Sequence, residues 1–176
     1  MSRWMRGRPP AIQAGRRFPA NPAPPPGRPN GMTMMKRILA PLDAREDSER
    51  IVPVVAALAR DTGATVRLLR VFPVPAPVVG LHGRVVAYVD QEMERLTHEG
   101  LAELARVEAA LAGVPVERVV RFGDADEETA LEAEAFGADL IALTAARAGR
   151  LRRALSPALA ERVAGHTPVP TLVLRG

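Results

Sequence analysis

Apolar residues recur along residues 36–175 with two alternating periodicities. Short apolar runs at 36–42, 64–72, 114–122, 140–144 and 169–174 have the length and composition of strands. Between them, apolar residues return every three or four positions, which predicts amphipathic helices near 48–62, 85–111, 124–136 and 157–165. Glycines at 63, 113 and 137 end the first three helices.

Strands that alternate with helices predict a layered α/β domain. Five strands and four helices in this order form a doubly wound parallel sheet, because each crossover is right-handed. The run at 114–122 alternates most between apolar and polar residues, and we expect it near an edge of the sheet. The three prolines between 73 and 77 forbid ladder pairing and force a loop after the second strand.

Two helix starts carry capping signals. Asp47 and Ser48 precede the first helix and are candidate N-caps. Ser156 followed by Pro157 has the sequence of an N-cap and a first helical residue, which is a structural start for the last helix.

Residues 1–33 differ from the rest of the chain in composition. They hold eight of the 17 prolines, four glycines, six arginines and no acidic residue. Such a segment buries too little apolar surface to offset its ordering entropy, and we predict a disordered extension followed by one domain at 34–176. Without those arginines, the total of 24 basic residues falls to 18 against 20 acidic ones, so the net charge of +4 becomes −2. The high pI therefore belongs to the extension, and binding of nucleic acid by the domain is not expected.

The remaining composition excludes some classes of site. There is no cysteine, which rules out disulfides and thiolate metal sites and favours a reducing cytoplasm. No apolar run approaches the roughly 20 residues that span a bilayer, so we expect no membrane partner. The three histidines, His82, His98 and His166, have no metal-ligand spacing, and their spacing suggests no serine or acid partner, so we expect no metal and no enzyme activity.

Several short segments resemble those of the universal stress protein family. They are I-L-A-P-L-D at 38–43, S-E-R at 48–50, G-D at 123–124, G-A-D-L-I at 137–141, A-E-R-V at 160–163 and H-T-P-V-P-T-L-V at 166–173. The resemblance covers residues 36–175. It implies a strand order of 3-2-1-4-5, a homodimer built around the last strand, and a cytoplasmic regulatory role in the stress response.

Many members of that family bind ATP through a loop of pattern G-x2-G-x9-G-(S/T). Glycines let the backbone approach phosphates, and the following helix N-terminus supplies N–H groups and a positive dipole. Aligning this chain on residues 160–163 places Thr144, Arg147, Pro157 and Ala158 at the four defining positions, and none of them matches. We therefore expect a regulatory binding module that does not hold ATP in the standard way and has no resident cofactor.

Two alternatives remain open. In the first, the chain binds ATP or another adenine nucleotide through the acid after the first strand and the arginine-rich loop at 145–156, because guanidinium groups can hold phosphate bidentately. In the second, the basic extension binds anions or nucleic acid. The candidate nucleotide-binding residues are Pro41, Asp43, Val71, Gly123, Thr144, Arg147, Gly149, Arg150, Ser156 and Ala158.

The last strand is the candidate dimer contact. Thr171, Leu172, Val173 and Leu174 form an apolar strand that is expected at an open sheet edge. An exposed edge of this kind pairs readily with another chain, and a second copy would cover it.

Overall fold

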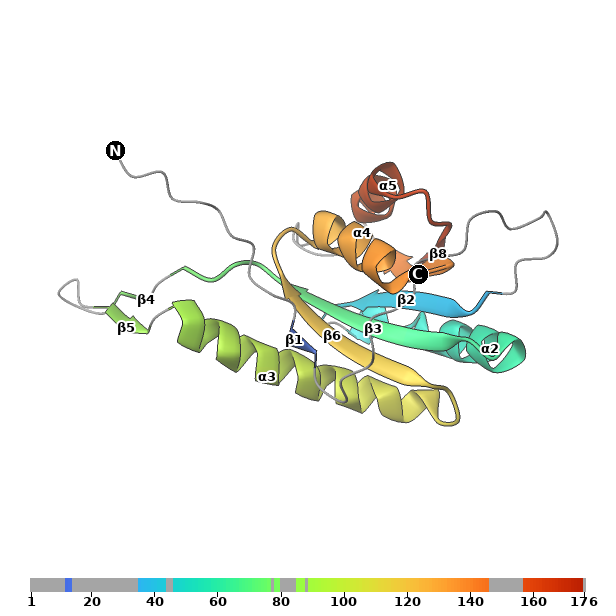
Figure 1. Cartoon of the computed structure of the whole chain (residues 1–176), viewed down its shortest axis with the longest axis horizontal. Coiled ribbons are helices and arrows are strands. Elements are labelled where there is room, and N and C mark those ends of the chain that lie inside the picture. Colours follow the sequence, from blue (N-terminus) through green and yellow to red (C-terminus); the bar gives the residue numbers. More distant parts are fainter. Residues whose placement is uncertain are drawn as a thin grey trace.

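A parallel sheet forms the centre of the computed structural model, which describes residues 12–13, 35–43, 46–76, 78–79, 85–87, 89–145 and 157–175 (Figure 1). Its strands lie in the order β1-β6-β3-β2-β7-β8. The five long strands are parallel and confirm the predicted order 3-2-1-4-5, while β1 joins the β6 edge antiparallel. The strands are β1 Ile12–Gln13, β2 Arg37–Leu42, β3 Thr65–Phe72, β6 Val116–Phe122, β7 Leu140–Ala145 and β8 Thr171–Arg175.

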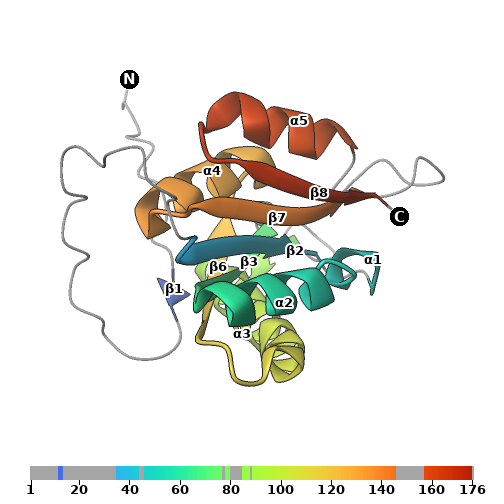
Figure 2. The same ribbon diagram turned by 90° about the vertical axis from the view of Figure 1, so that its right-hand side faces the viewer.

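Helices cover both faces of this sheet, as the doubly wound class requires (Figure 2). Residues of α2 and α3 share one apolar cluster with β2 and β3, whereas α4 and α5 contribute to a second cluster on the opposite face. Alternate residues of each strand therefore enter different cores: Ile38 lies in the first and Leu39 in the second, and both are fully buried. The helices are α1 Glu46–Glu49, α2 Val52–Thr62, α3 Val89–Glu108, η2 Ala109–Leu111, α4 Ala125–Phe136 and α5 Pro157–His166.

Two boundaries differ from the sequence prediction. The helix predicted at 85–111 begins later, at Val89, because Val85–Ala87 forms strand β5, paired antiparallel with β4, Val78–Val79. A run of β-branched valines favours a strand over a helix start. The first helix is also split: α1 covers four residues, and α2 begins at Val52 with Ile51 at its N-cap position. Ser48 is thus not the cap of the long helix.

The extension at 1–33 is described at two residues, those of β1. The remaining residues lie outside the described part of the chain, and their predicted disorder stays a prediction.

One aspartate joins the amino ends of the two central strands. Asp139, directly before β7, accepts hydrogen bonds through Oδ2 from the N–H groups of Lys36 (2.8 Å) and Arg37 (3.1 Å) at the start of β2. Its own N–H donates to the Arg37 carbonyl at 2.9 Å. Gly137, which ends α4 at φ 64°, lies so close that an added Cβ would be 2.9 Å from Arg37 Nη1. The G-A-D-L-I segment therefore serves the register between β2 and β7.

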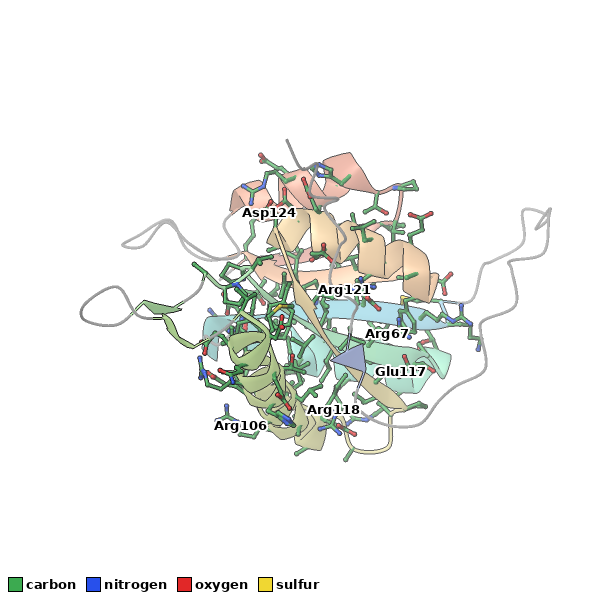
Figure 3. The ribbon with its side chains drawn as sticks, turned by 60° about the vertical axis from the view of Figure 1, so that its left-hand side comes forward. Arg67, Arg106, Glu117, Arg118, Arg121 and Asp124 are labelled. Carbon is green, nitrogen blue, oxygen red and sulfur yellow. The ribbon has the colours of Figure 1, made fainter. Side chains whose placement is uncertain are left out.

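Helix α4 lies on the sheet through charged as well as apolar contacts. Glu132 is 1% exposed and receives Arg67 Nη1 at 2.6 Å, together with Nε of Arg121. Arg67 also pairs with Glu117 of β6 and lies 4.0 Å from the centre of the Phe136 ring. Figure 3 shows Arg67, Glu117 and Arg121 on the strands beneath α4. A carboxylate this buried is stable there because two guanidinium groups satisfy it.

Substituting Glu132 by Gln is expected to destabilise the fold by about 3 kcal/mol or more, since it leaves two largely buried arginines without their shared carboxylate. Urea unfolding followed by circular dichroism measures this loss.

The matched control is Glu92→Gln. Glu92 bonds Arg95 at 2.7 and 3.0 Å on the exposed side of α3, and this hydrogen bond lowers the pKa of Glu92. An exposed pair of this kind contributes little, so the unfolding midpoint should stay unchanged. Equal effects of the two substitutions would contradict a structural role for the buried network.

Candidate functional site

The strand order reverses between β2 and β7. From β2 the chain builds β3 and β6 on one side, and it then crosses to build β7 and β8 on the other. In open α/β sheets, ligands bind beyond the carboxyl ends of the strands at such a switch point. Asp43 follows β2 at this place, and Thr144 lies near the end of β7.

Pro41 limits the pairing at the switch point. β2 pairs with β3 at all six of its residues, but its described pairing with β7 covers two positions, Ile38 with Leu140 and Leu39 with Ile141. The Arg37 carbonyl accepts a bond from the β7 side, so by strand alternation the backbone groups of residues 37, 39 and 41 face β7. The next hydrogen bond of the ladder would need an N–H at Pro41, which proline lacks. The proline thus ends the ladder where the site begins.

Ser48 fixes the backbone of Asp43. Its hydroxyl accepts a hydrogen bond from the Asp43 N–H at 3.2 Å and donates to the Asp43 carbonyl at 3.0 Å. Ser48 is 3% exposed, so these bonds form out of contact with water. Ser48 therefore holds the backbone of Asp43 at the carboxyl end of the central strand.

Thr144 is part of the same network. Its hydroxyl donates to the Ser48 carbonyl at 3.3 Å, and its side chain is 3% exposed. Thr144 belongs to β7 and pairs in register with Leu174 of β8. In the alignment on residues 160–163, Thr144 takes the position of the first glycine of the family loop. Here it is a strand residue whose hydroxyl is hydrogen-bonded to Ser48 of α1.

Gly123 and Val71 lie at the carboxyl ends of the two strands on the other side of β2. The Gly123 N–H donates to the Phe72 carbonyl at 2.9 Å. At φ 150°, an added Cβ would lie 2.9 Å from Cγ and Oε1 of Glu128, so the local packing of α4 is sufficient reason for a glycine here. Val71 is half-buried against the cluster under α4 and α5.

The structure thus unites part of the predicted site. Asp43 and Thr144 both bond Ser48, Pro41 lies in β2 two residues before Asp43, and Val71 and Gly123 lie at the ends of neighbouring strands. Ala158 lies in the first turn of α5, which begins at Pro157 as its capping signal predicted. The predictions for Arg147, Gly149, Arg150 and Ser156 fall on residues 146–156, which lie outside the described part of the chain.

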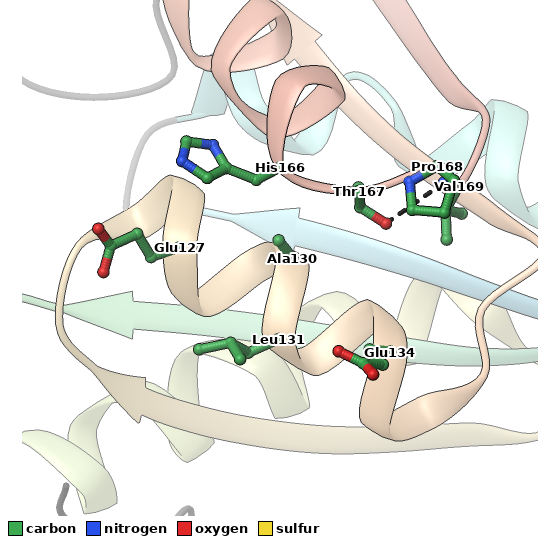
Figure 4. Close-up of a pocket in the computed structure, with 8 residues that line it drawn as sticks. All are labelled: Glu127, Ala130, Leu131, Glu134, His166, Thr167, Pro168 and Val169. Atoms are coloured by element: carbon green, nitrogen blue, oxygen red, sulfur yellow. Dashed lines mark hydrogen bonds between the residues drawn. The ribbon is translucent and has the colours of Figure 1, made fainter.

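A surface groove between α4 and the segment that joins α5 to β8 was not predicted. It has a volume of about 550 Å³, and Figure 4 shows Glu127 and Glu134 at opposite ends of the stretch of α4 that lines it. His166 borders the groove, and its Nδ1 lies 2.7 Å from the Arg162 carbonyl in the last turn of α5. Sequence periodicity could not reveal the groove, because it forms where α4 meets the residues at and after the end of α5, a contact that has no local signal in the sequence.

Among the described side chains, no group of three or more His, Cys, Asp or Glu residues is placed to hold a metal ion. No helix in the described ranges is both long and apolar enough to cross a bilayer.

Five parallel strands in this order, with an acidic residue at the carboxyl end of the central one, define a doubly wound, Rossmann-like α/β protein. The chain belongs to the universal stress protein family, whose sequence model matches residues 34–175. The resemblance read from its short segments is confirmed.

Solved structures share this fold. The hypothetical protein MJ0577 is 24% identical, with a TM-score of 0.64, over 82% of this chain and 98% of that chain. A universal stress protein in complex with cAMP is 18% identical, with a TM-score of 0.54, over 81% and 98%. A family member from Arabidopsis thaliana, At3g01520 with AMP bound, is 12% identical, with a TM-score of 0.52, over 80% and 91%. Comparison with curated proteins gave no match.

Replacing Ser48 by Ala is expected to lower the stability by about 1–2 kcal/mol, because two half-buried backbone groups of Asp43 lose their hydrogen bonds to the Ser48 hydroxyl. The specific readout is hydrogen exchange at the Asp43 amide, which should become faster. The Gly137 amide, bonded to the Glu134 carbonyl at 2.9 Å, serves as an internal control and should not change. An unchanged Asp43 amide would show that Ser48 does not hold this segment.

Proposed function

We propose that this chain is a homodimeric regulatory binding module of the universal stress protein family, and that it does not hold ATP through the family's glycine loop. It is not proposed to be an enzyme. The observation that carries the proposal is the place of Thr144 within β7.

A phosphate-binding glycine has two useful properties: phosphate can approach its backbone because there is no side chain, and its backbone can adopt a wide range of conformations. Thr144 has neither property. Its hydroxyl is bonded to the Ser48 carbonyl, and its residue pairs with Leu174 in the β7–β8 ladder. A backbone held in this way cannot wrap around a triphosphate as a glycine loop does, which supports loss of the standard ATP mode.

Binding of an adenine nucleotide in another way is the second candidate. Asp43 stands at the carboxyl end of the central strand with its backbone fixed by Ser48. Two family members of this fold are known with cAMP or AMP, ligands that carry one phosphate rather than three. A site of this kind would depend on contacts to the nucleoside, with Arg147 and Arg150 as candidate partners of a single phosphate.

Thermal melting of the full chain with excess Mg-ATP, and separately with excess AMP, tests these candidates. A ligand at about 100 times its Kd adds about 2.7 kcal/mol of stability, which is several degrees for a domain of this size. The proposal expects no shift with ATP at millimolar concentration.

The control variant is Asp43→Asn, which removes a charge while keeping the shape of the side chain. A shift with AMP alone that this variant abolishes would establish the second candidate. A shift with ATP that requires Asp43 would overturn the proposed loss of ATP binding.

The proposed dimer contact is the free side of β8. In the described part of the chain, β8 has β7 on one side and no strand on the other. Leu172 is 36% exposed, and Thr171, Val173 and Leu174 are half-buried. Leu172 pairs in register with Ala142 of β7, which belongs to the apolar cluster under α2 and α3. Leu172 therefore lies on the same face of the sheet as α2, but α2 covers this face only nearer the centre of the sheet (Figure 2). An apolar edge of this kind favours pairing with a second copy.

Leu172→Arg is expected to convert the dimer to monomer, because it places a charge in an apolar edge contact. Sedimentation equilibrium of the full chain measures the change. Val74→Arg is the matched control, since Val74 is 55% exposed in the loop after β3, away from β8. A wild-type chain that sediments as a monomer at micromolar concentration would contradict the dimer.

A further inference from the structure

The second edge of the sheet is formed by β6. The backbone groups of this strand alternate between its two sides. The Val66 N–H donates to the Pro115 carbonyl and the Gly123 N–H donates to the Phe72 carbonyl, both at 2.9 Å, so the odd-numbered residues of β6 face β3. The N–H and C=O groups of Val120 consequently point outward, away from the parallel sheet.

The outward side is occupied by a segment from the opposite end of the chain. Ile12 pairs antiparallel with Val120, and Gln13 pairs with Val119. Because Val120 presents its backbone groups outward, Ile12 and Val120 form the hydrogen-bonded pair of this short ladder. Figure 3 shows β1 beside β6, at the level of Glu117 and Arg121.

The sequence explains why this stretch of the extension is suited to the edge. Ile12 is the only isoleucine, leucine or valine in residues 1–33. It lies in a proline-free run, A-I-Q-A-G-R-R-F at 11–18, bounded by Pro10 and Pro19. Proline cannot donate to a ladder, and a β-branched residue favours a strand, so this run is better suited to pairing than the proline-rich remainder.

We propose that the outer edge of β6 is a strand-acceptor site and that its occupant is this chain's own Ile12–Gln13 segment. The extension acts as an intramolecular added strand, and it closes an edge that would otherwise accept an extended segment of another chain. The two edges of the sheet then have opposite roles: β8 stays open to a second copy, and β6 is closed from within.

The connection between β1 and β2 is compatible with this arrangement. It contains about 23 residues, which reach about 70 Å when extended. β6 lies two strands from β2, a distance of about 10 Å. A connection of this length allows an effective concentration on the order of millimolar, so even a weak contact is populated.

The test is hydrogen exchange at single amides of the full chain, comparing Ile12→Pro with wild type. Proline at position 12 removes the N–H that donates to the Val120 carbonyl, which detaches the segment whose Ile12 carbonyl accepts the Val120 N–H. Protection of the Val120 amide should fall about tenfold, as expected for the loss of one local hydrogen-bonded contact. The Val119 amide, which faces β3, should stay protected and reports that the sheet is intact.

Ala23→Pro is the matched control, because it adds a proline to the same extension outside the pairing segment. It should leave the Val120 amide protected. A synthetic peptide of residues 10–18, added at millimolar concentration to the Ile12→Pro chain, should restore the protection, and the same peptide carrying the proline should not.

Three outcomes would overturn the proposal. One is a Val120 amide that exchanges as fast in wild type as in the Ile12→Pro chain. Another is failure of the peptide to restore protection. The third is protection in wild type that rises with protein concentration, since this would assign the occupant to a second copy instead of the same chain.

Discussion

The short ladder between β2 and β7 is the constraint on which the rest of this structure depends. It joins the two halves of the sheet, β6-β3-β2 and β7-β8, through a few backbone bonds and the Asp139 carboxylate. At the amino end the aspartate holds the register, and toward the carboxyl end Pro41 stops the pairing. The same two strands therefore form both the central joint of the fold and the place where a ligand site can exist, because a continuous ladder would leave no room between them.

The region beyond this joint is held by side chains rather than by a ladder. Ser48 and Thr144 connect the ends of β2 and β7 through one chain of hydrogen bonds, with Asp43 at its solvent side. In a family whose nucleotide loops use bare glycine backbone, such a network changes what the site can accept. It keeps the acidic residue in place, and under the proposed function it restricts the phosphate part of the site while leaving the nucleoside part available.

The two faces and the two edges of the sheet are stabilised differently. The face under α2 and α3 is an apolar core, whereas α4 combines its apolar contacts with a carboxylate buried between Arg67 and Arg121. Buried charges contribute little net stability, but they allow a single placement of the helix, because any other leaves a charge unpaired. The edges differ too, since β8 presents apolar side chains and β6 receives β1. Regulation by such a module would act through these surfaces, with the sheet as a rigid support.

The sequence by itself determined the class of fold, the strand order through the family resemblance, and the positions of Asp43 and Gly123 at strand ends. Hydrophobic periodicity and the glycines and prolines that end helices and strands are local features, so they can be read directly from the sequence. Only the tertiary structure decided that Ser48 binds Asp43 instead of capping a helix, that Val85–Ala87 is a strand, and that Glu132 is buried between two arginines from different strands. These facts depend on which residues meet across the sheet, and Thr144 and Ser48, which are 96 positions apart, carry no local signal of their contact.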